Sequence, residues 1–399
     1  MKRILENPSS ISEVGFFSRL RQTRRCIKRI HSEKCDESKI DSTLPMVSVM
    51  LITYNHEKYI EQAMSSILAQ ECDFDIEINV IDDCSTDNTQ SIVEAYQKQY
   101  PEIINCYFNQ QNVGHIATQL NTFRGFQTLR GKYFCILEGD DFWTSPEKLK
   151  KQVGFLEENQ EYAACAHDTL KVFEDGREPE HFLPFKSFGR NRVSMFDLVT
   201  MAGAFHVSSI VYRNKFGLNP PQCLADPYSC EITVNMVYGQ FGDFFCLNEY
   251  MSAYRVHGGG TFSSRSLEEH WLFHLHGYQR FFMYLGHRYW MMFARAVVGF
   301  SKYVLTAYKK GVCDKLKHSS TLTFMIHYFV ASLMVGVNCF SKFRLLKTDK
   351  ARFKQLFVLN SVRLYYAIAT RIPKPVRQLL RPIKRLLVNK FHAVKSSKR

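Results

Sequence analysis

The sequence predicts an α/β fold with a Rossmann-like, mostly parallel sheet flanked by helices, followed by a helical and basic C-terminal region. Short apolar runs alternate with amphipathic helical patterns between residues 47 and 156, a rhythm typical of parallel sheets covered on both faces. Polar residues recur where these runs end, as expected of a ligand-binding sheet edge. The basic charge is concentrated outside this centre, so the chain has more than one part.

Four strands and four helices follow from the pattern. The run at 47–53 is apolar throughout, which is typical of a strand buried on both faces. Strands are expected at 47–53, 76–81, 105–108 and 133–137. Helical spacing of apolar residues, capping side chains and a Ser-Pro-Glu start predict the helices between and after them. These helices are expected over 60–68, from 85–87 onward, through Phe123 and from 145–147 onward.

The carboxyl ends of the strands carry the candidate chemistry, because ligands of open α/β sheets bind there. These ends are 53–55, 82–83, 112–114 and 138–141. Two of them hold an acidic pair, and neighbouring carboxylates repel one another unless a cation lies between them. Their oxygens suit Mg²⁺ or Mn²⁺, and such an ion suits a diphosphate. The alternative is that both pairs only cap the helices that follow.

Five ordered motifs lie within residues 46–262: VSVMLITYNHEKYIEQAMSSILAQ, INVIDDCSTDNT, NVGHIATQLNTFRG, GKYFCILEGDDFW and YRVHGGG. Together they resemble glycosyltransferase family 2, which has the GT-A fold, and most of all its bacterial members that build capsule, exopolysaccharide or O-antigen chains. The resemblance implies that residues at the first three strand ends bind a nucleotide-sugar. These are Thr53, Tyr54, Asn55, Asp82, Asp83, Asn112 and Gly114. Tyr54 would stack on the base, and Asp83 would accept a hydrogen bond from a uracil-type N–H.

The segment Glu138-Gly139-Asp140-Asp141 resembles the metal motif of this family. Asp140 would contact the ribose or the sugar, and Asp141 would ligate a divalent metal, Mg²⁺ or Mn²⁺. Glu138 stands where the family usually has aspartate, which leaves the direct ligand in place. The resemblance also implies that His257 closes over the metal and the diphosphate, with Arg255 pairing with phosphate.

An inverting transferase of this family needs a general base from an acidic residue beyond the metal motif. Asp226 is the first candidate, because it precedes Pro227 as a residue that starts a helix would. Glu231 is the second. The alternative for Asp226 is a plain helix cap. The sequence Ala225-Asp226-Pro227 departs from the usual family pattern at this position.

The two ends of the chain are basic and the centre is acidic. Residues 1–45 form a basic arm, residues 46–265 the expected catalytic domain, and residues 266–399 a helical region whose tail from Lys342 onward carries 17 Lys and Arg against one acid. Such a tail favours an anionic membrane surface. The uncharged segment 319–341 has the length of a membrane span, but its polar residues fit a buried or re-entrant helix equally well. Twelve scattered cysteines without a Cys-x-x-Cys pair indicate free thiols, so we expect the protein at the cytoplasmic face of a membrane.

The resemblance therefore implies an inverting glycosyltransferase with a nucleotide diphosphate-sugar donor, UDP-linked, and a glycan or lipid-linked acceptor in cell-surface polysaccharide synthesis. A nucleic-acid binder that uses the basic tail is a rival, but the tail lacks a base-reading module, so no nucleic acid is expected as a partner. Two other rivals are a phosphate-transferring enzyme built on Asp82 and Asp83 and a protein that binds sugar nucleotide without transfer.

Overall fold

The computed structural model describes residues 18, 21–23, 25–26, 44–112, 121–182, 190–200, 205–226, 229–259 and 284–285. The chain divides into two compact units, 1–286 and 287–399, and every described residue belongs to the first. The uncharged segment 319–341 and the basic tail lie outside the described residues. Among those that are described, no helix combines the length and the apolar character that crossing a bilayer requires.

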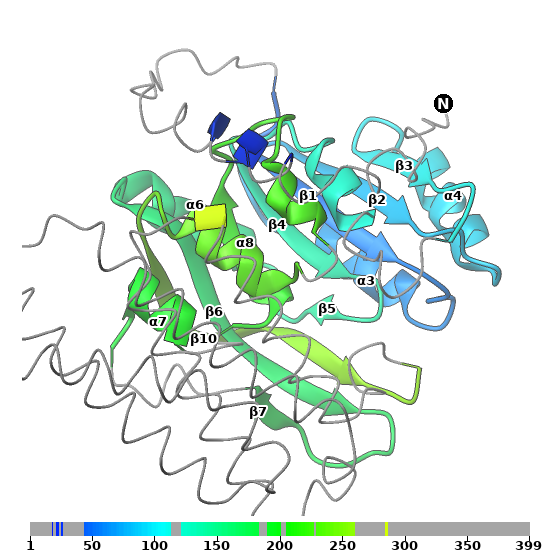
Figure 1. The fold of residues 1–399 in the computed structure, drawn as a ribbon. Coiled ribbons are helices and arrows are strands. Elements are labelled where there is room, and N and C mark those ends of the chain that lie inside the picture. Colours follow the sequence, from blue (N-terminus) through cyan, green and yellow to red (C-terminus); the bar gives the residue numbers. More distant parts are fainter. Residues whose placement is uncertain are drawn as a thin grey trace, which may run out of the picture. The chain divides into compact units, whose positions relative to one another are not determined.

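One sheet organises the first unit, in the order β3-β2-β1-β4-β9-β6-β10-β5, with β7 paired to β6 and β8 paired to β10 (Figure 1). The strands are β1 (Val47–Thr53), β2 (Ile76–Asp82), β3 (Ile104–Phe108), β4 (Tyr133–Glu138), β5 (Phe142–Trp143), β6 (Tyr162–Phe173), β7 (Glu180–Phe182), β8 (Arg192–Val193), β9 (Val211–Arg213) and β10 (Asp243–Val256). The helices are α3 (Ile60–Leu68), α4 (Thr89–Gln99), α6 (Lys148–Glu158), α7 (Met195–Thr200) and α8 (Glu231–Tyr238), with 3-10 turns η3 (Val207–Ser209) and η4 (Gln222–Ala225).

The four predicted strands are confirmed and pair in parallel as β3-β2-β1-β4. The prediction of a mostly parallel sheet is wrong for the other half. There β9 runs antiparallel to both β4 and β6, while β10 returns parallel to β6. The alternation of strands and helices ends near residue 156, and the strands that pair antiparallel after it, β7, β8 and β9, are only two or three residues long. The sheet is therefore mixed.

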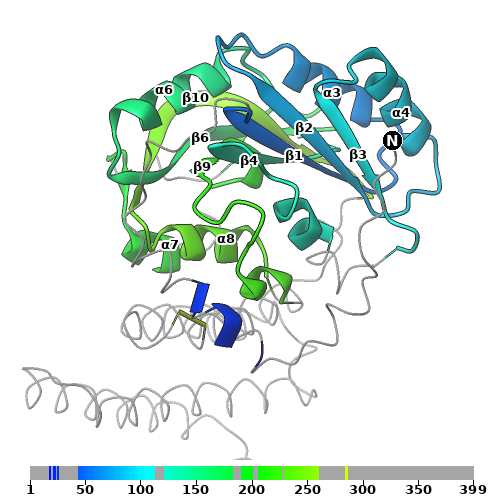
Figure 2. The ribbon, with the colours of Figure 1, turned by 90° about the horizontal axis from the view of Figure 1, so that it is seen from above.

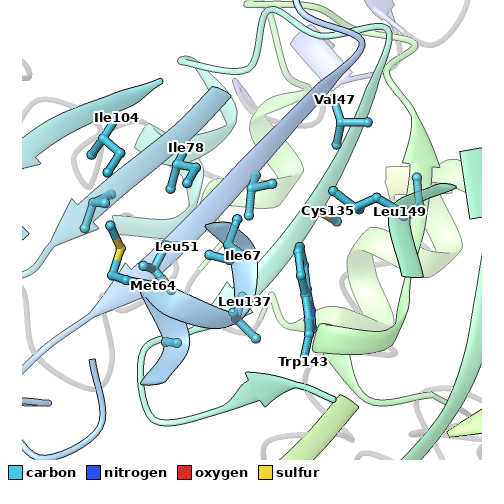
Figure 3. Packing of buried hydrophobic residues seen from close by; sticks show 14 of the residues in the cluster. Val47, Leu51, Met64, Ile67, Ile78, Ile104, Cys135, Leu137, Trp143 and Leu149 are labelled. Atoms are coloured by element: carbon cyan, nitrogen blue, oxygen red, sulfur yellow. The ribbon is translucent and has the colours of Figure 1, made fainter. Parts of the chain in front are cut away.

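Two layers of helices cover the sheet (Figure 2). Helices α3, α4 and α6 lie on one face, while α7 and α8 lie on the other. Alternate residues of each strand point to opposite faces, so Val47 and Leu51 of β1 and Cys135 of β4 enter the core under α3 and α6. Figure 3 shows Met64 and Ile67 of α3 packed against this layer. Burial of these apolar side chains fixes the sheet edge that the site needs.

The same alternation directs the other residues of β4 toward α8. Phe134 stacks on Tyr212 of β9 at 4.8 Å between ring centroids, and Tyr238 of α8 packs against both rings. Glu138 follows Phe134 by four positions and thus lies on the same face, at the carboxyl end of β4. Strand pleating therefore places an acidic side chain beside the start of α8.

Described residues of the N-terminal arm pack on η4 of the same compact unit. The backbone N–H of Gln222 donates to Gln22 Oε1 at 2.9 Å, and that of Cys223 donates to Thr23 Oγ1 at 3.0 Å. Thr23 is fully buried. These residues thus contact η4 of the predicted domain 46–265. The boundaries at 45 and 265 stay predictions.

Candidate functional site

The carboxyl ends of β1, β2 and β4 meet at one edge of the sheet. In the strand register Thr53 lies beside Asp82, and Ile52 lies beside Glu138. The turns continue this pairing, since Asp83 N–H donates to the Thr53 carbonyl at 3.0 Å and Gly139 N–H donates to that of Ile52 at 2.8 Å. The strand ends that the sequence singled out are therefore neighbours in the structure.

Asp82 and Asp83 differ in their surroundings. Asp82 is fully buried, and its carboxylate accepts hydrogen bonds from the backbone and hydroxyl of Ser85. Asp83 accepts from Asn109 Nδ2 at 2.9 Å, while Asn112 Nδ2 donates to its backbone carbonyl at 3.1 Å. Asp82 thus holds the turn after β2, and Asn112 ties the next strand end to Asp83. Their nucleotide-binding roles stay predictions.

The loop after β1 has a defined shape. Asn55 adopts a positive φ of 54°, a conformation that asparagine tolerates better than most residues. Its side-chain oxygen accepts from Thr86 N–H at 2.8 Å, and its own N–H donates to Ser85 Oγ at 2.9 Å. Tyr54 next to it is 41% exposed. An aromatic ring presented on a fixed loop can stack on a planar base. Gly114, the last predicted donor residue, lies outside the described residues.

The end of β10 closes over the acidic turn. Arg255 N–H donates to Asp141 Oδ1 at 2.9 Å, and the Arg255 guanidinium donates to the Asp140 carbonyl at 2.9 Å. Nε2 of His257 lies 3.0 Å from Asp140 Oδ2, and His56 Nε2 lies 3.7 Å from the same oxygen. Burial alone would raise the pKa of Asp140, but the two histidines hold it below its usual value. His257 thus contacts Asp140 here, and its predicted part in metal binding stays a prediction.

A group of three side chains fits a divalent cation. Ligand atoms of Glu138, Asp141 and His206 all lie within 4.8 Å of one another. Two ligand atoms that each lie about 2.1 Å from Mg²⁺ are at most about 4.2 Å apart. Small side-chain rotations would therefore bring the three ligand atoms to coordination distance. Asp141 is 1% exposed and its Oδ2 has no hydrogen-bond partner. A buried carboxylate oxygen without a donor is a position where a cation is expected.

The electrostatics of these groups favour a cation as well. Burial, then Asp140 and Glu138, raise the pKa of Asp141 well above its usual value. Burial, then Asp140 and Glu231, raise the pKa of Glu138 to about 8. Asp141 is buried whereas the end of the Glu138 side chain reaches solvent, so crowding of negative charge is the cause that both shifts share, and a divalent ion would relieve that repulsion. His206, whose pKa burial lowers to about 4, is neutral at pH 7 and offers a nitrogen lone pair.

The two candidate bases occupy different environments. Asp226 is fully buried, and Tyr284 Oη donates to its Oδ2 at 2.6 Å. Glu231 is half-buried at the first turn of α8, and its charge acts on Glu138 across the site. The structure therefore brings Glu231 to the acidic group. The predicted catalytic role of Asp226 is untested, and its burial does not favour it.

Sequence reasoning missed three residues that take part in this arrangement. His206 comes from η3, far from every recognised motif, and His56 and Tyr59 lie in the loop after β1. The Tyr59 ring packs on His257 at 4.8 Å between centroids and under the Arg255 guanidinium at 5.0 Å. His56 and Tyr59 stand inside the first recognised motif, so attention to its polar residues could have found them. No local signal marks His206.

Fold and site together define an α/β protein of the GT-A type, with a mixed sheet and an acidic cluster at its edge. Residues 48–209 match the family model described as glycosyl transferase family 2. This match confirms that the motifs of residues 48–209 resemble glycosyltransferase family 2.

Known proteins similar to this chain agree with the assignment. An uncharacterised protein of Mycobacterium tuberculosis is 32% identical over 218 residues, covering 55% of this chain and 61% of that protein. The putative teichuronic acid biosynthesis glycosyltransferase TuaG of Bacillus subtilis is 36% identical over 114 residues, covering 29% and 43%. The crystal structure of TarS residues 1–349 from S. aureus superposes with a TM-score of 0.53 at 17% identity over 88% of this chain and 91% of that one. This last likeness concerns the fold. The chain thus spans about three fifths of the mycobacterial relative.

Proposed function

We propose that this protein is a metal-dependent inverting glycosyltransferase that takes a sugar from a UDP-linked donor. Its acceptor would be a hydroxyl of a glycan or of a lipid-linked saccharide in cell-surface polysaccharide synthesis. The observation that carries the proposal is the buried Asp141 Oδ2, which accepts no hydrogen bond and lies beside Glu138 and His206, at the sheet edge where nucleotides bind in this architecture.

Donor binding would use the three strand ends in turn. Asp83 would accept the base N–H, and the Tyr54 ring would cover the base from its fixed loop. Glu138, Asp141 and His206 would hold a divalent ion, which when bound neutralises charge on the diphosphate. Asp140, kept ionised by His56 and His257, would accept hydrogen bonds from sugar or ribose hydroxyls.

Glu231 supplies the base in this proposal. The acceptor oxygen attacks the anomeric carbon, the bond from that carbon to the diphosphate oxygen breaks, and the acceptor proton passes to the Glu231 carboxylate. The nucleoside diphosphate leaves with the bonding electrons, and the anomeric configuration inverts. Burial raises the pKa of Glu231, which brings it nearer to neutral pH and makes the carboxylate a better base. Asp226, bound by Tyr284, would instead hold the segment before α8.

The proposed location is the cytoplasmic face of the cell membrane. It rests on the basic tail, whose charge would hold the protein to anionic lipid at about 1 kcal/mol per basic residue near the surface. Docking there would bring the site to lipid-linked acceptors. The name of the Bacillus relative, which refers to teichuronic acid biosynthesis, supports a role in polysaccharide synthesis.

A donor screen tests the proposal. Purified full-length protein is incubated with a panel of UDP- and GDP-sugars, with Mn²⁺, with Mg²⁺ or with chelator, and released nucleoside diphosphate is measured. We expect release with a UDP-sugar that chelator abolishes. Asp141→Asn should lose it, whereas Asp175→Asn, an exposed aspartate paired with Arg177, should keep it. Donor binding without release under any condition, or full activity of Asp141→Asn, would refute the proposal.

A further inference from the structure

Three neighbouring strands carry aromatic and charged side chains beside the acidic group. β6 lies between β7 and β10, and its Lys171 is paired with Glu180 of β7 on one side and with Tyr254 of β10 on the other. Residues paired in this way share a face of the sheet, and Phe182 lies on the same face because it follows Glu180 by two positions. This face therefore presents two aromatic rings together with an amine and a carboxylate.

The rings of Phe182 and Tyr254 pack together next to His206. Their centroids lie 5.5 Å apart in an edge-on arrangement, and the His206 ring lies 5.0 Å from that of Phe182 and 4.6 Å from that of Tyr254. His206 Nε2 in turn lies 3.7 Å from Asp141 Oδ2. His206 thus stands between the aromatic pair and the acidic group.

Tyr254 adds a hydroxyl to the aromatic pair. Burial, and then Glu138 and Asp141, raise the pKa of Tyr254 to about 12, so its hydroxyl keeps its proton at pH 7. Among the residues that the structure describes, Tyr254 Oη has no hydrogen-bond partner. A phenolic O–H can donate to one hydroxyl of a ligand and accept from another. The aromatic pair therefore has a polar contact to offer close to the carboxylates.

The composition of this face fits a sugar ring. Phe182 and Tyr254 are half-buried and Glu180 is exposed, so a ligand can reach them. The negative face of an aromatic ring attracts the polarised C–H bonds on one side of a pyranose. Lys171 Nζ lies 5.5 Å from the centroid of the Phe182 ring and can donate to sugar hydroxyls, while the Glu180 carboxylate can accept from them. An alkyl chain would leave these polar groups without hydrogen bonds.

The charges beside the rings favour a neutral sugar. Lys171 and Glu180 occupy paired positions and are opposite in sign, so their fields largely cancel over the rings. A sugar with its own carboxylate would be attracted by one of these charges and repelled by the other. We propose that Phe182 and Tyr254 form the subsite that binds the acceptor, and that the ligand of this subsite is the neutral pyranose ring that bears the attacking hydroxyl.

This inference rests on the proposed function for the place of the reaction, and a binding measurement without turnover tests it separately. Full-length protein with UDP and MgCl₂ is mixed with the methyl β-glycosides of glucose, galactose and N-acetylglucosamine, with methyl glucuronide, or with 1-octanol. Saturation-transfer difference NMR measures binding. We expect saturation of ring C–H protons in at least one neutral glycoside, and weaker binding of methyl glucuronide and octanol.

Side-chain variants separate stacking from general apolar packing. Phe182→Ala should weaken binding of the neutral glycoside about fivefold to tenfold, Phe182→Leu should weaken it nearly as much, and Phe182→Tyr should restore it. Tyr254→Phe keeps the ring and should weaken binding about threefold to tenfold. Phe155→Ala is the matched control, because Phe155 is a half-buried aromatic on α6 that stacks on Phe245, and it should bind the glycoside like wild type.

Absence of saturation in every neutral glycoside, equal binding by wild type and Phe182→Ala, or tighter binding of methyl glucuronide or octanol would overturn the inference. If Phe182→Ala does not fold, Phe182→Leu and Tyr254→Phe still decide. Glycoside binding in a protein that releases no nucleoside diphosphate from any donor would refute only the proposed function. Donor turnover without glycoside binding would refute only the acceptor subsite.

Discussion

Replacing Lys148 by methionine should stabilise the protein near neutral pH. Lys148 begins α6, its side chain is fully buried, and its Nζ has no hydrogen-bond partner. Burial lowers the pKa of Lys148 from 10.5 to about 8, although Cys135 and Cys165 oppose the change. The ammonium lies 4.2 Å from the centroid of the Trp143 ring, which attracts it. Methionine keeps the apolar stem and removes the charge.

The size of the effect follows from these two terms. A pKa lowered by about 2.5 units means that the buried charge destabilises the native state by about 3 kcal/mol. The attraction between the ammonium and the Trp143 ring stabilises the native state by about 2 kcal/mol. Lys148→Met should therefore be about 1 kcal/mol more stable at pH 7. Below pH 8 the amine is charged in both states, so the whole difference is present there. It shrinks as pH rises toward 10.5, where the unfolded amine also loses its proton.

Urea unfolding of both proteins at pH 7 and at pH 9.5 measures this difference. Lys151→Met is the matched control, because Lys151 lies on the same helix but is exposed and paired with Glu147 and Glu249. Its free energy of unfolding should stay within about 0.5 kcal/mol of the wild-type value. A Lys148→Met variant less stable than wild type at pH 7, or a difference that pH leaves unchanged, would refute the reasoning.

Three further predictions concern the site and the tail. Glu231→Gln should bind donor normally, and its kcat should fall by at least about a hundredfold. Asp226→Asn should mainly lower the unfolding midpoint. If instead Asp226→Asn loses kcat and Glu231→Gln loses stability, Asp226 is the base. Gly139→Ala should reduce kcat, because its Cβ would stand 2.8 Å from His56 Nδ1 and 2.9 Å from Thr53 Oγ1, and wild-type rates would contradict that. Deleting 342–399 should release the protein from sedimented membranes, and unchanged sedimentation would assign the anchor elsewhere.

Local signals were enough for the first half of the sheet. The run Val47–Thr53 is apolar at nearly every position, which is typical of a buried strand, and the helical patterns between the runs indicated parallel partners. The strand ends then had to meet, because parallel strands finish at one edge. That inference placed Thr53, Asp83 and Asp141 near one another without any structural information.

Tertiary contacts decide the rest, and the sequence carries no local sign of them. The antiparallel direction of β9 depends on its pairing with β4 and β6, and the sequence of its three residues does not indicate this pairing. Asp226-Pro227 has the local pattern of a helix start, yet the described helix begins at Glu231 and Asp226 ends a 3-10 turn. The sequence does not distinguish His206 from the other thirteen histidines, and only the packing of η3 and β10 places it near Asp141.

The contact of Thr23 and Gln22 with η4 has a consequence for synthesis of the chain. Partners separated by 200 residues cannot meet until the ribosome has made the second of them. Gln22 and Thr23 therefore stay without these partners while β1 to β9 are synthesised. This docking can therefore follow the assembly of β1 to β9 but cannot precede the synthesis of Cys223.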